Sequence, residues 1–112
     1  MFSRELTAAS AKPIVLAILA RGESYGYEII QEVKRRSNGE IQWAEGALYP
    51  VLHRLERQGL IESVWRVSDS GRKRKYYRLH EAGQQALATE RKQWMITHDV
   101  LTSLWGPEPW LT

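Results

Sequence analysis

Residues 59–79 read GLIESVWRVSDSGRKRKYYRL, and within this stretch the expected structure changes from helix to strand. In IESVWRV (61–67) side chains alternate between two faces with period two, as they do in a β-strand. The composition of SDSG (68–71) is typical of a turn, and RKYYRL (74–79) resumes the β-rich pattern. The sequence therefore predicts a β-hairpin over residues 60–79, with its cations at the tip.

A first helix is predicted well upstream, where apolar side chains recur at helical spacing. In KPIVLAILARG (12–22) this spacing favours a helix that ends near Ala20 or Arg21, because a glycine follows. Pro13 lacks a backbone donor, so the helix is expected either to start afresh near Lys12 or to kink there.

Two further helices are predicted between the first helix and the hairpin. Residues 24–36 begin with a serine suited to capping, carry acidic residues early and end on basic residues, which complements the helix dipole. The stretch AEGALYPVLHRLERQGL (44–60) is amphipathic with a largely cationic outer side. Pro50 is best tolerated in a first turn, so this third helix is expected to start near Gly46 or Ala47.

A last, long helix is predicted over residues 80–105, where Gly106 and Pro107 end it. Side chains spaced alternately by four and three residues form the seam of a coiled coil along it. The predicted interface residues are Leu87, Arg91, Trp94, His98, Leu101 and Trp105. Because such a seam commonly joins two chains, the sequence predicts a homodimer.

Composition narrows the possible functions. The chain has 112 residues, enough for one domain, and its 16 Lys and Arg slightly outnumber its 13 Asp and Glu. Five of these cations lie within residues 72–78, so positive charge is concentrated in one place. The absence of cysteine excludes disulfides and thiolate sites. No signal peptide or run of ~20 apolar residues is present, so we expect a soluble, cytoplasmic protein without a membrane partner.

Three helices followed by a two-stranded ribbon form the element order of a winged helix-turn-helix. In such domains the third helix enters the DNA major groove, and the ribbon, or wing, reaches an adjacent groove or the phosphates. Cations on the wing would neutralise phosphates and release counterions. Alternatively, they only prevent edge-to-edge aggregation, and those on the third helix form a solvated face. The predicted DNA-contacting residues are Tyr25, Tyr49, His53, Arg54, Arg57, Arg72, Lys73, Arg74 and Lys75.

Other aromatic side chains are expected to be structural. Trp43 and Trp65 are expected to be partly buried anchors for the third helix and the wing. Strand alternation should send one of Tyr76 and Tyr77 into the domain and the other outward. Trp110, in the tail, has no predicted role.

Three stretches carry a resemblance to a known family: YGYEIIQEV (25–33), GALYPVLHRLERQGLIES (46–63) and GRKRKYYRLHEAGQQAL (71–87). Over nearly its whole length the chain resembles the PadR family of bacterial transcriptional regulators. The resemblance implies a homodimeric repressor that binds double-stranded DNA at a pseudo-palindromic operator through two winged domains, with the last helix as dimer interface.

The single C-terminal helix is similar to the short branch of that family, which includes multidrug-sensing regulators. In those members a tryptophan on the last helix stacks on flat aromatic ligands, and Trp94 occupies the matching position. His98, one turn on, stands where they carry an acidic residue, so the resemblance does not extend to their cationic ligands. Trp94 and His98 are thus a predicted site for a planar aromatic effector; packing of Trp94 in the dimer core is the alternative.

The predicted organisation is mainly α with a small β-hairpin: a winged helix-turn-helix domain over 1–79, a dimerisation helix over 80–105 and a tail over 106–112. No cofactor and no enzymatic activity are expected, because the sequence contains no metal-ligand spacing, phosphate loop or nucleophile motif. The predicted function is sequence-specific DNA binding by a repressor that a small molecule releases. Two alternatives stay open: a winged-helix domain that binds an acidic protein partner, and a ligand-binding dimer with little specific DNA affinity.

Overall fold

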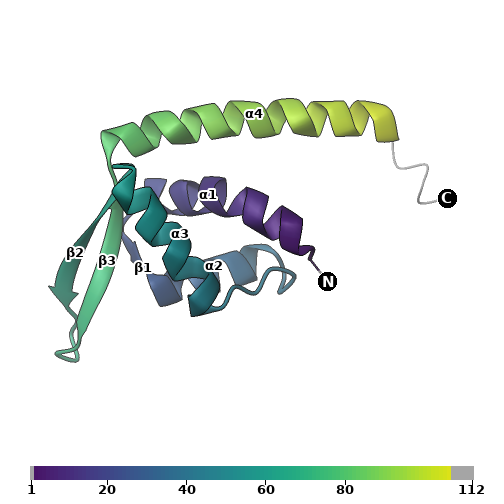
Figure 1. Cartoon of the computed structure of the whole chain (residues 1–112). Coiled ribbons are helices and arrows are strands. Elements are labelled where there is room, and N and C mark those ends of the chain that lie inside the picture. The colour runs from purple at the N-terminus through teal and green to yellow at the C-terminus, as the bar shows by residue number, and fades with distance from the viewer. Residues whose placement is uncertain (1, 107–112) are drawn as a thin grey trace.

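The computed structural model describes residues 2–106, which form four helices and a three-stranded antiparallel sheet (Figure 1). In chain order the elements are α1 (Arg4–Ala20), β1 (Ser24–Tyr25), α2 (Gly26–Arg36), α3 (Glu45–Arg57), β2 (Ile61–Val67), β3 (Lys73–Leu79) and α4 (Glu81–Trp105). Helices α1, α2 and α3 surround one core, the β2–β3 hairpin extends from it as a wing, and α4 runs along α1. This is the mainly helical winged architecture that the sequence predicts.

The core forms where the apolar faces of α1, α2 and α3 meet the base of the sheet. Its largest fully buried side chains are Val15, Leu16, Ile29, Leu48, Leu52, Leu55, Ile61 and Tyr77. Trp43 is also buried, as predicted, and Tyr77 points inward while Tyr76 stays half-buried. The prediction for Trp65 is wrong: its side chain is 63% exposed, because β2 extends past the core and leaves this position without a neighbouring layer.

Helix α1 is continuous through Pro13, so of the two predicted alternatives, a fresh start near Lys12 or a kink, the fresh start is wrong. Ser3 caps the helix by accepting a hydrogen bond from the Leu6 amide at 3.1 Å. The carbonyl of Ala9 loses its partner at Pro13, but Ala9 is exposed and water can satisfy that carbonyl. A cap and an exposed carbonyl thus allow a helix to run across the proline.

Strand β1 is the main feature that the sequence patterns did not predict. Ser24, expected to cap a helix, pairs with Tyr77 of β3, and Tyr25 pairs with Tyr76 and precedes α2 as its N-cap. Glu28 accepts hydrogen bonds from the Ser24 hydroxyl at 3.1 Å and the Tyr25 amide at 3.3 Å. The sheet therefore has three strands in the order β1–β3–β2, where only a hairpin was expected.

The wing differs from the prediction in where its cations lie. The turn comprises residues 68–72, with the Ser68 amide donating to the Arg72 carbonyl at 2.8 Å and Gly71 at a φ of 82°. Lys73, Arg74 and Lys75 lie along β3 and not at the tip. Alternation then separates them onto two faces of the wing.

Helix α3 begins at Glu45, slightly earlier than predicted, so Pro50 lies in its second turn. The Ala44 carbonyl accepts the amides of Ala47 at 3.0 Å and Leu48 at 3.1 Å, which fixes the start. Pro50 is exposed and its missing donor leaves only a solvent-side carbonyl without a partner, so the helix continues.

The first half of α4 packs closely on the domain. A Cβ atom at Gly83 would lie only 2.1 Å from the Leu60 carbonyl oxygen, and this carbonyl also accepts the His80 amide at 3.0 Å. Lys12 of α1 and Glu90 form an ion pair at 3.7 Å. These contacts fix the direction in which α4 leaves the wing.

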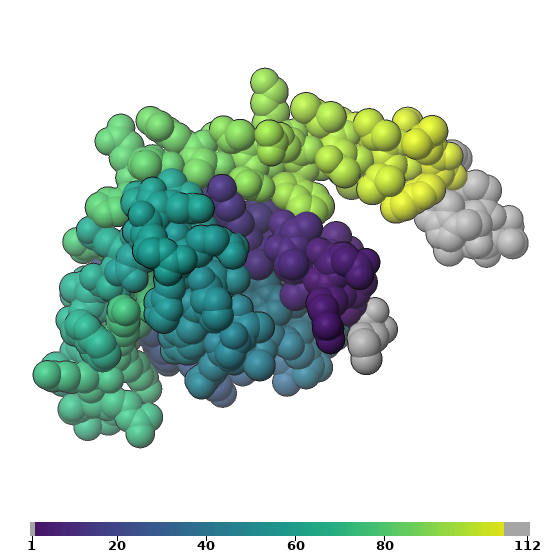
Figure 2. All heavy atoms as spheres, viewed as in Figure 1, coloured from purple at the N-terminus to yellow at the C-terminus, as the bar shows by residue number. Residues whose placement is uncertain are grey.

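The second half of α4 projects past the body of the domain (Figure 2). The helix ends at Trp105, as predicted, and Gly106 follows with a φ of 74°. The rest of the predicted tail, including Trp110, lies outside the described residues. No helix within residues 2–106 is long and apolar enough to span a bilayer.

Candidate nucleic-acid interface

The outward face of α3 is defined by its three buried leucines, which turn the opposite side of the helix to solvent. At about 100° per residue, the middle of that opposite side carries Gly46, Pro50, His53 and Arg57, with Arg54 at its edge. All of these residues are exposed, and no atom lies within 4 Å of a Cβ built on Gly46. Gly46 and Pro50 are not among the predicted contacts, because that prediction rested on charged and aromatic side chains. A helical wheel centred on the leucines would have found these small residues, which let another surface approach closely.

Tyr49 is less accessible than predicted, because it joins α3 to α2. Its hydroxyl oxygen lies 2.6 Å from the place that a Cβ on Gly26 would occupy, and its ring centroid is 6.3 Å from that of His53. Tyr49 is therefore half-buried and helps to fix the position of α3.

One face of the wing continues the surface of α3. Cross-strand pairing places Trp65 opposite Lys75 and Val67 opposite Lys73. These four residues share a face with the buried Ile61, and near the base the Ser63 hydroxyl donates to Glu56 of α3 at 2.7 Å. We call Trp65, Val67, Lys73 and Lys75 the outer wing surface.

Two more of the predicted contacts, Tyr25 of β1 and Arg74 of β3, lie on the opposite face of the sheet. The Tyr25 and Tyr76 rings meet edge to face with centroids 5.2 Å apart, and the Arg74 guanidinium lies 4.5 Å from the Tyr25 centroid. The structure therefore does not bring Tyr25 and Arg74 together with α3, because pairing with β3 turns both to the far side of the sheet.

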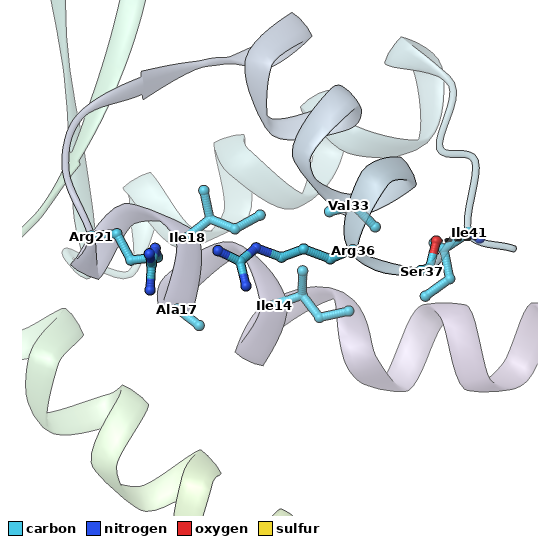
Figure 3. Close-up of a pocket in the computed structure, with 8 residues that line it drawn as sticks. All are labelled: Ile14, Ala17, Ile18, Arg21, Val33, Arg36, Ser37 and Ile41. Atoms are coloured by element: carbon cyan, nitrogen blue, oxygen red, sulfur yellow. Dashed lines mark hydrogen bonds between the residues drawn. The ribbon is translucent and has the colours of Figure 1, made fainter. Parts of the chain in front are cut away.

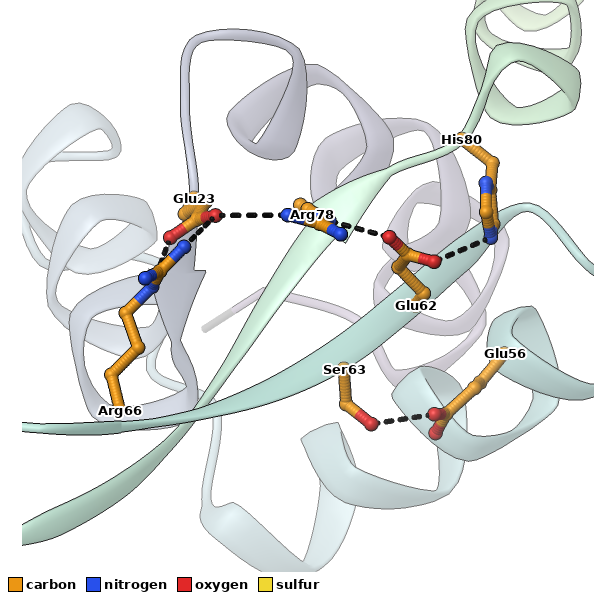
Figure 4. A network of polar contacts seen from close by, with 7 residues as sticks. All are labelled: Glu23, Glu56, Glu62, Ser63, Arg66, Arg78 and His80. Carbon is orange, nitrogen blue, oxygen red and sulfur yellow. Dashed lines mark hydrogen bonds and ion pairs between the residues drawn. The ribbon is translucent and has the colours of Figure 1, made fainter.

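An ion-pair network that the sequence prediction missed also lies on this opposite face (Figure 4). Arg66 donates to both carboxylate oxygens of Glu23, at 2.8 and 2.7 Å, and Arg78 contacts both Glu23, at 3.7 Å, and Glu62. His80 lies 3.0 Å from Glu62. The charge pattern alone could not have linked Glu23 to β2, because 43 positions separate it from Arg66.

These contacts determine which wing cations remain available. The hydrogen bond from Arg66, with the charges of Arg66 and Arg78, holds the pKa of Glu23 below its ordinary value; Arg78 does the same for Glu62. Both carboxylates stay negative and offset the two arginines. Among the described residues, by contrast, Lys73 and Lys75 of the outer wing surface, Arg72 of the turn and Arg74 of the opposite face pair with no carboxylate. Two of these cations lie over aromatic rings: Arg74 over Tyr25, and Lys75 with its ammonium 5.4 Å from the Tyr77 centroid. The unpaired positive charge of the wing therefore lies mostly on the α3 side.

Apolar cavities border α1, and two of them lie beside α2 and α4. One, of about 390 Å³, lies between α1 and α2 among Ile14, Ile18 and Val33, and the Arg36 side chain extends across it (Figure 3). The other, of about 470 Å³, lies between α1 and α4 and is lined in part by Trp94. Of these two cavities, only the second contains a residue of the predicted ligand site, Trp94. The other residue of that site, His98, lies one turn further along α4 and is exposed.

The predicted seam of α4 is divided between the domain and solvent. Leu87 packs against the core and Trp94 is half-buried, whereas the remaining predicted residues, Arg91, His98, Leu101 and Trp105, are exposed. Further large apolar side chains on the projecting half are exposed and were not predicted: Met95, Ile96, Val100 and Leu104. The apolar surface of α4 is thus wider than a coiled-coil seam.

Comparison with known proteins identifies the fold and the function class. The family model described as the transcriptional regulator PadR-like family matches residues 15–89. The chain belongs to the PadR-like family. This PadR-like chain is 39% identical over 89 residues to the transcriptional regulator Rv3488 of Mycobacterium tuberculosis, a match that covers 80% of the former and 79% of the latter.

Solved structures agree with this assignment. A transcriptional regulator from Clostridium thermocellum superimposes with a TM-score of 0.82 at 27% identity, covering 92% of the PadR-like chain and 97% of the other. A PadR-like transcriptional regulator from Bacillus cereus gives 0.81 at 27% identity, covering 93% and 99%. The protein is therefore a DNA-binding transcriptional regulator and not an enzyme, as its motifs predicted.

Proposed function

We propose that this PadR-like protein is a homodimeric repressor that binds a pseudo-palindromic operator, with α3 in the major groove and the wing on the backbone. The observation that carries the proposal is the continuity of two positive surfaces. Arg54 and Arg57 are exposed on α3 beside His53, and Lys73 and Lys75, which pair with no carboxylate, lie on the wing face that adjoins it. Phosphates are the partner that such a surface suits best.

The exposed half of α4 supports the homodimer. Ile96, Val100 and Leu104 are between 50% and 77% exposed. A second α4 would cover these side chains from water, which favours association. A two-fold dimer also presents two α3 helices, as half-sites about one helical turn apart require.

The cavity between α1 and α4 supports release by a small molecule. A planar aromatic compound could stack on Trp94 there and contact both helices. The dimer can hold its two winged domains at the spacing that fits the operator or at another spacing. If the compound binds the second conformation more tightly, it shifts the population away from the DNA-binding one. Packing of Trp94 within the dimer is the competing explanation.

The experiment is a salt series of fluorescence anisotropy on duplex DNA from the region upstream of the protein's own gene. Tight binding that competing random duplex does not remove supports sequence-specific recognition. Replacing Lys73 and Lys75 with Ala should weaken binding to every duplex and flatten the salt slope by roughly one unit for each phosphate that the wing no longer neutralises. Lys92→Ala, which removes the same charge from an exposed position on α4, should leave the slope unchanged. An unchanged slope in the double variant would show that the wing does not touch DNA.

A further inference from the structure

The outer wing surface contains two large apolar side chains that the proposed phosphate contacts do not use. Trp65 is 63% exposed and Val67 is 66% exposed. The same strand face is fully buried at its base, where Ile61 and Tyr77 enter the core. An apolar strip therefore continues outward from the core into solvent, beside the exposed side of α3.

Each of these apolar side chains has a cation directly opposite it on β3. Lys75 pairs with Trp65 and Lys73 with Val67, so apolar and positive groups lie side by side at the spacing of neighbouring strands. The other face of the wing instead carries the carboxylates of Glu23 and Glu62. Of the two faces of the wing, only the outer wing surface combines exposed apolar side chains with cations that have no carboxylate partner.

The sugar–phosphate backbone of a duplex has the complementary pattern. Each apolar deoxyribose face lies next to an anionic phosphate, and apolar side chains are known to enter minor grooves beside basic ones. A protein partner with an apolar patch would not by itself explain the lysine opposite each exposed side chain. Charge complementarity therefore favours DNA as the occupant.

We propose that Trp65 is a DNA-contacting residue, which packs its indole on the deoxyribose faces of the groove next to the one that α3 enters. Val67 extends this contact toward the tip of the wing, while Lys73 and Lys75 hold the adjacent phosphates. The inference rests on the proposed DNA binding and adds to it a contact that is apolar and therefore nearly independent of salt.

The test compares Trp65→Ala and Trp65→Thr with wild type in the anisotropy salt series described above. Both variants should bind duplex on the order of tenfold more weakly at every salt concentration, with an unchanged salt slope. Trp65→Phe, which keeps an aromatic ring, should bind within about twofold of wild type on the same reasoning. Threonine favours strands, so Trp65→Thr guards against a loss of wing structure, which far-UV circular dichroism would detect.

Three outcomes would overturn the inference, and they are distinguishable. If the Trp65 variants bind like wild type while the lysine variants flatten the slope, DNA binding stands and Trp65 takes no part in it. If wild type itself shows no salt-dependent affinity for any duplex, the proposed function fails as well. If Trp65→Thr changes the oligomeric state in sedimentation, Trp65 is instead a contact between protein chains.

Discussion

Replacing Gly83 with Ala should destabilise the protein, although alanine is the better helix former. Gly83 is in the first turn of α4, where the added Cβ would lie 2.1 Å from the Leu60 carbonyl oxygen and 2.7 Å from Leu79 Cδ1. A carbon and a carbonyl oxygen in close contact are about 3.3 Å apart. The helix or the strand backbone must therefore move by about 1 Å.

The size of the destabilisation follows from three contributions, two that destabilise the folded protein and one that opposes them. Overpacking of this kind costs about 1–3 kcal/mol. Movement of the Leu60 carbonyl also stretches its 3.0 Å hydrogen bond from the His80 amide, which adds up to about 1 kcal/mol. Against this, Gly→Ala gains about 0.4–1 kcal/mol by restricting the unfolded chain. With mid-range values for all three, the net change should be a loss of about 2 kcal/mol in the free energy of unfolding.

Urea unfolding followed by circular dichroism, at one protomer concentration, measures this loss. The free energy of unfolding falls by about 1–3 kcal/mol for each molar increase in urea, so this loss of stability should lower the unfolding midpoint by roughly 1 M. Gly46→Ala is the matched control, because Gly46 is also in the first turn of a helix but has no atom within 4 Å of its Cβ position. Its midpoint should stay the same or rise. If Gly83→Ala is as stable as Gly46→Ala, the close contact between α4 and Leu60 does not exist.

Three further predictions concern the dimer, the effector and pH. Leu101→Glu places an unpaired charge in the proposed interface and should give monomers in sedimentation at micromolar concentration, so a persistent dimer would exclude this half of α4 from the interface. Planar aromatic compounds should quench tryptophan fluorescence in wild type and much less in Trp94→Ala; equal quenching in both proteins would remove Trp94 from the site. Because the hydrogen bond from Arg66 lowers the pKa of Glu23, their interaction stabilises the fold fully above about pH 4.5 and is lost as the pH falls further. Thermal unfolding of Arg66→Ala should therefore depend less on pH in that acidic range than wild type, and equal profiles would contradict the pairing.

Local patterns in the sequence predicted the elements that depend on local interactions. The helical spacing of Leu48, Leu52 and Leu55 places one face of α3 in the core, and the period-two pattern of residues 61–67 gives β2. Because side-chain period and chain stereochemistry act over a few residues, the sequence alone was enough to predict these elements and the exposed cations of α3. The three family motifs likewise predicted a DNA-binding regulator.

Only the tertiary structure decided how distant segments share a surface. Ser24 and Tyr25 form a strand because β3 supplies hydrogen-bonding partners, and two residues are too few for a strand pattern to be visible. Pairing with β3 also turns Arg74 and Tyr25 away from α3 and leaves Trp65 uncovered beside two lysines. The identity and order of the residues determined the elements. Strand register and the extent of the core determined which side chains are free to bind. Register and core extent depend on contacts between residues far apart in the chain, so local sequence patterns do not show them.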